Sequence, residues 1–272
     1  MSIEETTYKP LHRYVLEIAY DGTNYSGWQI QPHRLAVQEV IQKILSYMYM
    51  DQSIHLIGCS RTDAGVHALG FVASFLAPER PDIAPEKLLK AVNRQLPGDI
   101  KIMSIKEVPF EFHSRYDAKG KAYTYVLNLK ESSPFSDRYS WRPLRRLNPE
   151  LLNAAAQRLV GTHDFSSFVV ERNKIDDAVR TIYRIDQQLF GDYCTLTFVG
   201  NGFLYKMIRC LMGTIEAAGA GKLSPDAVTR ILESKDRTNA PETAPPQGLF
   251  LMKVFYDEEE LHNFKLEKLP FH

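Results

Sequence analysis

One carboxylate stands out as a candidate reactive group: Asp63, within residues 58–68, GCSRTDAGVHA. It follows Arg61 by two residues and precedes a turn of small residues, Ala64–Gly65. Strand-like runs lie on both sides, so we expect a loop that a rigid scaffold presents to a substrate. A carboxylate there can act as a nucleophile or as a base. The alternative is that Asp63 only caps the turn.

Two tyrosines, Tyr123 and Tyr125, lie on a predicted strand, where side chains two residues apart point to the same face. Rings placed in this way often pack in a core. The functional alternative is that a ring stacks on a base, as single-stranded nucleic acid often requires.

Arg209 lies on a predicted helix, next to the face that carries its apolar residues. A charge in such a place is costly to bury unless it is paired. A neighbouring carboxylate would be a suitable partner, because the Arg would lower the carboxylate pKa and keep the group ionised at neutral pH. The alternative is that Arg209 lies at the surface, with the aliphatic part of its side chain along the helix.

Residues 20–31 combine two glycines with Tyr20, Tyr25 and Trp28, which is too aromatic for an ordinary loop. The stretch is either a structural plug or an edge that faces RNA. The sequence contains no Walker loop, no G-x-G-x-x-G and no H-E-x-x-H motif. Residues 161–168 hold His, Asp and Ser together, but neighbours in sequence rarely form a catalytic triad.

The composition is that of an ordinary globular protein, with 272 residues, 44% of them hydrophobic. The 33 basic and 33 acidic residues cancel, which argues mildly against a polyanion ligand, although local clusters of charge govern attraction. The three cysteines form no C-x-x-C pair, so neither a disulfide framework nor a zinc site is expected. No apolar run reaches the roughly 20 residues that cross a bilayer, and the polar N-terminus does not read as a secretory signal. We expect a protein of the reducing cytoplasm.

Strands and helices alternate irregularly, which favours an α+β fold with mainly antiparallel sheets covered by helices. Strands are predicted at 14–20, 55–59, 71–75, 100–108, 122–129, 182–190, 193–199 and 249–255. Helices are predicted at 36–50, 85–95, 148–160 and 203–218, with a further helix starting at 224. Pro109 interrupts the pattern, so we expect a domain boundary between residues 109 and 116.

Six motifs, in order along most of the chain, resemble the TruA family of tRNA pseudouridine synthases. They are Tyr20-Asp-Gly-Thr with Gly27-Trp-Gln-x-Gln31, Ser60-Arg-Thr-Asp-Ala-Gly-Val-His67, Phe112-His-Ser-Arg115 with Lys121-Ala-Tyr123, Gly161-x-His-Asp-Phe-x-Ser-Phe168, Gly202-Phe-Leu-x-x-Met-x-Arg209 and Pro246-Gln-Gly-Leu249. Two departures are Lys121-Ala122, where relatives commonly have two arginines, and Tyr205-Lys206, where an Arg-His pair is frequent. The family's loop corresponding to residues 131–146 varies widely, so its phosphate contacts cannot be carried over.

The resemblance implies a role for each candidate residue. Asp63 would be the essential aspartate, and Arg61 would enter the RNA stem and help hold the target nucleotide out of it. Tyr123 would stack on the target base, and Arg209 would pair with Asp63. The fold would consist of two similar α+β halves, residues 1–112 and 113–272, with a basic cleft between them.

The resemblance also implies the reaction and its partners. The substrate would be the anticodon stem-loop of tRNA, with uridines 38, 39 and 40 isomerised by a homodimer that needs no cofactor and no metal. The residues leave open whether Asp63 attacks the sugar, attacks the base or removes a sugar proton. Two competing hypotheses are a non-catalytic RNA-binding protein and a hydrolase with an Asp nucleophile, which would need a second acid or a metal cluster near Asp63.

Overall fold

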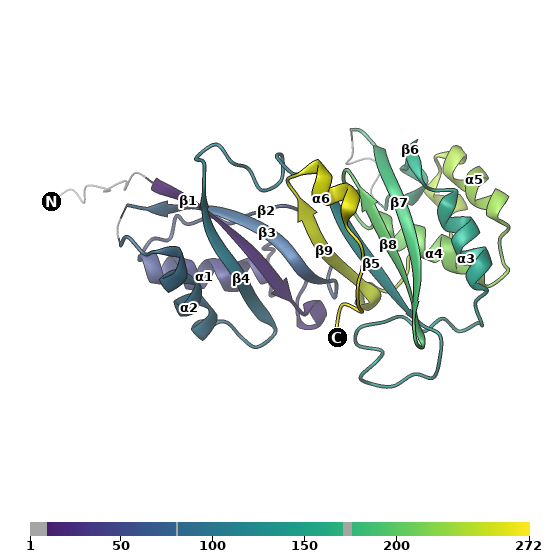
Figure 1. Cartoon of the computed structure of the whole chain (residues 1–272), viewed down its shortest axis with the longest axis horizontal. Coiled ribbons are helices and arrows are strands. Elements are labelled where there is room, and N and C mark those ends of the chain that lie inside the picture. The colour runs from purple at the N-terminus through teal and green to yellow at the C-terminus, as the bar shows by residue number, and fades with distance from the viewer. Residues whose placement is uncertain (1–9, 80, 171–175) are drawn as a thin grey trace. The chain divides into compact units, whose positions relative to one another are not determined.

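The computed structural model describes residues 10–79, 81–170 and 176–272 (Figure 1). The chain forms two compact units, Met1–Ala118 and Lys119–His272. None of the described helices is long and apolar enough to cross a bilayer.

The first unit is built on an antiparallel sheet in which β1 (Pro10–Tyr20) pairs with both β3 (His67–Pro78) and β4 (Ile100–Val108). The short strand β2 (Ile57–Gly58) adds to β3. Along β1, buried and more exposed residues alternate, so one face of the sheet forms the core.

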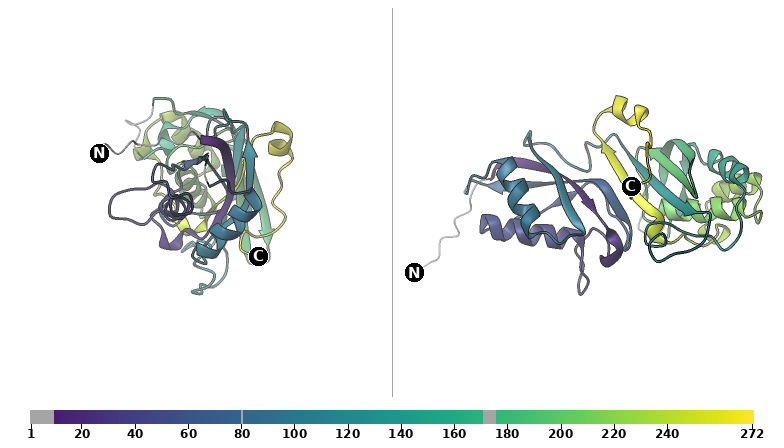
Figure 2. Two further views of the ribbon diagram at one scale, coloured as in Figure 1. Left: turned by 90° about the vertical axis from the view of Figure 1, so that its left-hand side faces the viewer. Right: turned by 60° about the horizontal axis from the view of Figure 1, so that its bottom comes forward.

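Two helices, α1 (Val37–Tyr49) and α2 (Pro85–Gln95), complete the first unit (Figures 1 and 2). Helix α2 begins with Pro85, whose fixed φ suits the first helical position. Helix α1 ends at Met50, which adopts the left-handed conformation with a φ of 51°. Each helix buries an apolar stripe, as the 3.6-residue spacing of its side chains predicts.

The second unit contains a five-stranded antiparallel sheet. Its strands, in spatial order, are β9 (Leu249–Phe255), β5 (Gly120–Asn128), β8 (Tyr193–Gly200), β7 (Val179–Phe190) and β6 (Gly161–Asp164). Its longer helices are α3 (Pro149–Gln157), α4 (Met207–Gly219) and α5 (Pro225–Ser234). Single 3-10 turns lie at Gly22–Asn24 in the first unit and at Ser166–Phe168, Arg237–Asn239 and Pro246–Gly248 in the second.

Strand β5 is buried along most of its length because it is covered on both faces. The short helix α6 (Glu258–Asn263) places Leu261 in a cluster with Ala122, Val199 and Phe255. Tyr125, on the alternate positions of the strand, reaches the loop that precedes β9. The predicted α+β class with mainly antiparallel pairing is therefore confirmed.

Several predicted elements need correction. The helix predicted from Phe203 begins only at Met207, because Lys206 has a φ of 58° and cannot continue a helical turn. The strand predicted at 55–59 is reduced to Ile57–Gly58. Strand β6 and helix α6 were not predicted. For α6 the missed signal was Asp257, whose carboxylate caps the helix by accepting from the Glu260 nitrogen.

Candidate active site

Asp63 lies on the loop between β2 and β3, here called the Asp63 loop (residues 59–66), as predicted. The Arg61 side chain is exposed and Asp63 is partly exposed, whereas Thr62 between them is buried. The turn is closed by backbone groups, because the Val66 nitrogen donates to the Asp63 carbonyl at 3.1 Å. This backbone bond helps to set the shape of the turn.

A second stretch, here called the aromatic segment (residues 20–31), holds the Asp63 loop through its backbone. The Trp28 nitrogen donates to the Thr62 carbonyl at 3.3 Å, and the Gly65 nitrogen donates to the Tyr25 carbonyl at the same distance. The Tyr20 and Thr62 hydroxyls are 2.9 Å apart and hydrogen-bonded. These bonds fix the residues on both sides of Asp63.

Two glycines of the aromatic segment allow this close approach. A Cβ atom at Gly27 would lie less than 3.0 Å from the Thr62 carbonyl oxygen, and one at Gly22 would lie equally close to the Val66 carbonyl. Gly27 also has a φ of 88°, which side-chain-bearing residues rarely adopt. Glycine is therefore required at these positions by backbone-to-backbone contact.

The aromatic rings of this segment are buried and act as a plug. The Trp28 ring stacks on Phe71 of β3, with ring centroids 4.0 Å apart. The Tyr25 hydroxyl donates to a carboxylate oxygen of Asp99 at 2.5 Å. Of the two alternatives left open by the sequence, the structural plug is therefore the one that the structure supports.

His67, the first residue of β3 after the Asp63 loop, is buried and links the end of the loop to the same segment. Its Nδ1 accepts a hydrogen bond from the Gly22 nitrogen at 3.1 Å and lies 3.1 Å from a carboxylate oxygen of Asp21. Sequence reasoning missed this role, although His67 is the last residue of the quoted motif.

In the second unit, both tyrosines of β5 are buried. The Tyr123 ring meets Phe203 edge to face, with centroids 5.4 Å apart, and only 5% of the residue is exposed. The Tyr125 hydroxyl donates to the Pro245 carbonyl at 2.7 Å. Burial raises the pKa of Tyr125 well above 10.0, and the positive charge of Arg209 opposes this shift.

Arg209 is partly exposed on α4 and is linked to the loop before β9. Its Nε donates to the Ala244 carbonyl at 2.8 Å, while the Ala244 nitrogen donates to the Arg209 carbonyl at 3.0 Å. These bonds orient the guanidinium group. The predicted pairing of Arg209 with Asp63 stays a prediction.

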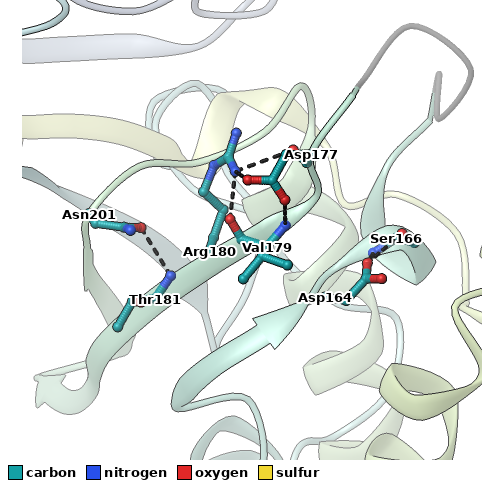
Figure 3. A network of polar contacts seen from close by, with 7 residues as sticks. All are labelled: Asp164, Ser166, Asp177, Val179, Arg180, Thr181 and Asn201. Atoms are coloured by element: carbon teal, nitrogen blue, oxygen red, sulfur yellow. Dashed lines mark hydrogen bonds and ion pairs between the residues drawn. The ribbon is translucent and has the colours of Figure 1, made fainter.

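The turn before α4 is held by polar contacts with β7 (Figure 3). The Thr181 nitrogen donates to the Asn201 side-chain oxygen at 2.9 Å, and the Asn201 nitrogen donates to the Thr181 carbonyl at 3.0 Å. The neighbouring Arg180 donates to the carbonyl of Val179 and lies 3.7 Å from the carboxylate of Asp177. The two hydrogen bonds between Asn201 and Thr181 fix Asn201. Asn201 lies two residues before Phe203, whose ring contacts Tyr123.

The His, Asp and Ser of residues 161–168 have structural roles. Asp164 accepts hydrogen bonds from the nitrogen and the hydroxyl of Ser166 (Figure 3), and chiefly the hydroxyl bond lowers the pKa of Asp164. A His163 ring nitrogen lies 3.0 Å from the Val160 carbonyl. The Asp164 carboxylate thus stabilises the turn at Ser166. This structural role agrees with the prediction that these residues do not form a catalytic triad.

Comparison with known proteins identifies the family. The sequence matches the tRNA pseudouridine synthase family over residues 17–117 and 155–257, more than half of the chain. The chain belongs to this family. Both units thus carry residues of the tRNA pseudouridine synthase match, and the match includes Asp63 as well as Arg209.

Individual tRNA pseudouridine synthases are similar over most of their length. The chain is 43% identical over 247 residues to tRNA pseudouridine synthase A of Thermoanaerobacter sp. (strain X514), covering 90% of this chain and 100% of that protein. It is 42% identical to tRNA pseudouridine synthase A of Geobacillus sp. (strain WCH70), over 88% of this chain and 96% of that protein. These relatives confirm the predicted TruA resemblance and an isomerase family that acts on tRNA.

A solved Cbf5-Nop10-Gar1 complex aligns with 88% of this chain and 58% of the other chain, at 12% identity and a TM-score of 0.34. A likeness at this level supports no conclusion about this chain. Among the described residues of this tRNA pseudouridine synthase family member, no group of three or more His, Cys, Asp or Glu side chains is placed to hold a metal ion.

Proposed function

We propose that this chain isomerises uridines 38, 39 and 40 of the tRNA anticodon stem-loop to pseudouridine, with Asp63 as the essential carboxylate. Family membership supports pseudouridine formation in tRNA. The observation that carries the role of Asp63 is its position: it is partly exposed on a loop whose neighbouring residues are fixed by the aromatic segment. A reactive group needs both access to substrate and a fixed position.

The reaction is balanced without an external reagent. The bond between N1 of uracil and C1′ of ribose breaks, the base turns, and C5 bonds to C1′ while C5 loses its proton and N1 gains one. No electrons and no phosphate group are transferred, so the proposal includes no cofactor and no metal. One ionised carboxylate suffices, whether it attacks the sugar, attacks the base or removes a sugar proton.

In this proposal the other site residues would assist extrusion of the base and would pair with Asp63. Taking a base out of its stack costs a few kcal/mol. Arg61, exposed beside Asp63, would fill the space that the nucleotide leaves, and the Tyr123 ring would stack on the uracil. Arg209, oriented by the Ala244 carbonyl, would pair with the Asp63 carboxylate.

The decisive experiment compares Asp63→Asn with Asp82→Asn, a matched change at an exposed acid in the same unit. Release of tritium from tRNA labelled at uridine C5 reports the reaction, and filter binding reports tRNA affinity. We expect Asp63→Asn to abolish tritium release and retain binding, while Asp82→Asn behaves like the wild type. Normal turnover by Asp63→Asn would refute the assignment.

Mapping of pseudouridine in a tRNA pool treated with the pure protein tests the sites of modification. Pseudouridine outside positions 38–40 would contradict the anticodon stem-loop assignment. Tight tRNA binding without any pseudouridine would instead favour a non-catalytic RNA-binding protein. The proposal also includes a homodimer that works in the cytoplasm, which sedimentation and cell fractionation test.

A further inference from the structure

The turn His113–Asp117, at the end of the first unit, is unusually well fixed for an exposed connection. The His113 nitrogen donates to the Asp117 carboxylate at 2.8 Å, and the Asp117 nitrogen donates to the His113 carbonyl at 3.1 Å. The His113 Nδ1 accepts from the nitrogens of both Arg115 and Tyr116, at 3.1 and 3.2 Å. The imidazole ring is thus held by the turn that surrounds it.

This turn presents an aromatic ring to solvent. Tyr116 is 75% exposed, and its ring lies over that of His113 with centroids 4.2 Å apart and an interplanar angle of 35°. The guanidinium carbon of Arg115 lies 5.7 Å from the Tyr116 ring centroid. A supported ring next to a cation has the two elements that bind single-stranded nucleic acid: a surface for a base and a charge for its phosphate.

The turn is anchored to the strand that leads into the Asp63 loop. Ser114 is fully buried, and its hydroxyl donates to the Ile57 carbonyl at 2.6 Å. Asp63 lies six positions after Ile57, a separation of at most about 20 Å along an extended chain. The exposed ring and the proposed catalytic carboxylate are therefore both connected to β2 within the first unit.

We propose that Tyr116 and Arg115 form a stacking platform for an unpaired nucleotide of the tRNA, near the uridine that reacts at Asp63. The inference rests on the proposed function and adds a binding site to it. The residues that flank the ring, Arg115 and Asp117, are exposed and charged. A protein partner would need a contact of roughly 800 Å² on each side, whereas one ring and one guanidinium suit a single nucleotide.

The test uses the full chain carrying Asp63→Asn, which blocks turnover, and an unmodified tRNA transcript as the probe. In this background Tyr116→Ala removes the ring, Tyr116→Phe keeps it, and Tyr47→Ala removes an equally exposed tyrosine, 74% exposed, from α1. We expect Tyr116→Ala to raise the Kd about 5- to 150-fold, the range for loss of one base–aromatic stack. The other two variants should stay within about twofold of the background.

The salt dependence separates the ring from the charge. Arg115→Gln should reduce the slope of log Kd against log salt by about 1, because one phosphate contact is lost. Tyr116→Ala should weaken binding and leave this slope unchanged. The thermal unfolding midpoint should not move for Tyr116→Ala, since the side chain is mostly exposed.

Equal affinities for Tyr116→Ala and Tyr47→Ala would overturn the platform. A change in oligomeric state on Tyr116→Ala, with unchanged tRNA affinity, would also overturn it and would show a protein interface instead. Failure of the proposed function is a separate result, because it would appear as tRNA without pseudouridine after treatment with the wild-type protein.

Discussion

The carbonyl oxygen of Thr62 occupies the space that a side chain at Gly27 would need, within 3.0 Å of the Cβ position. The same carbonyl accepts the hydrogen bond from the Trp28 nitrogen. The backbone at Thr62, next to Asp63, can therefore lie here because Gly27, 35 positions earlier in the sequence, has no side chain. Because this contact joins two backbones, neither partner can yield by changing a rotamer.

Gly27→Ala should therefore displace the Asp63 loop. The alanine would meet the Thr62 carbonyl and would also have to adopt a φ of 88°. We expect a loss of stability of more than about 1 kcal/mol and a loss of activity of about 100-fold, since a misplacement of 1 Å can have that effect. Urea unfolding and tritium release measure the two quantities.

Gly98→Ala is the matched control, because nothing lies within 4 Å of a Cβ atom at Gly98. Its stability should be unchanged or higher by about 0.4–1 kcal/mol, with normal activity. A similar loss of activity in both glycine variants would contradict the importance of the Gly27 contact.

Two buried tyrosines of the first unit should respond in opposite directions to removal of the hydroxyl. Tyr25→Phe loses the bond to Asp99 and should destabilise the protein by about 1–3 kcal/mol. The Tyr49 hydroxyl is buried and has no hydrogen-bond partner among the described residues. Tyr49→Phe should therefore leave stability unchanged or raise it by about 1 kcal/mol. Destabilisation by Tyr49→Phe, measured in urea, would argue against this prediction.

The same tyrosines predict the behaviour at high pH. Burial raises the pKa of Tyr49 and of Tyr25 above the ordinary value of 10.0, and the bond to Asp99 adds to the shift for Tyr25. Above about pH 10 the unfolded chain releases these protons while the folded chain retains them. The free energy of unfolding should therefore fall as pH rises above 10, and this fall should be smaller in Tyr49→Phe. Equal slopes between pH 9 and 11 would refute the assignment to Tyr49.

Arg209→Lys should impair the reaction although it keeps the charge. Lysine lacks the Nε that donates to the Ala244 carbonyl, and it lacks the planar fork that suits a carboxylate. We expect kcat/KM to fall by about 10- to 100-fold, the equivalent of one charged hydrogen bond. Arg230→Lys, at an exposed position on α5, should retain activity. Comparable turnover of both variants would contradict a specific role for the Arg209 guanidinium.

Tyr123→Phe should retain most activity, since the proposed contribution of Tyr123 is its ring. Tyr123→Leu keeps apolar volume beside Phe203 but removes the ring, so it should lose most activity with a modest change in stability. Equal activity loss in both variants would show that the hydroxyl matters more than the ring. Steady-state kinetics with tRNA, run beside urea unfolding, separate the two effects.

Local signals predicted much of the fold. The bounds of α2, β4 and β9 agree with their predicted ranges. Pro85 marks the start of the helix. The two strands are runs of alternating or apolar residues that end at turns. Local signals failed at α4, where Lys206 takes a backbone conformation that its residue type does not reveal. They also failed at β6, a four-residue strand that is defined by its pairing with β7.

Parts of the site could not be predicted because they depend on contacts between distant segments. The sequence marked Asp63 as a loop residue and residues 20–31 as unusually aromatic. That Gly27 and Trp28 lie against Thr62 is a property of the folded chain, which no periodicity encodes. Likewise Tyr116 is exposed and Ser114 is buried although they are near neighbours in sequence, and the bond from Ser114 to Ile57 is a contact between distant segments.

The order of these segments also bears on synthesis of the chain. The aromatic segment, which supplies the partners of the Asp63 loop, leaves the ribosome before that loop does. At about 5–20 residues per second, this segment emerges before Thr62 does, and its own contacts Phe71 and Asp99 follow later within the first unit. We therefore expect the support of the reactive carboxylate to form during translation, from the amino-terminal part of the nascent chain alone.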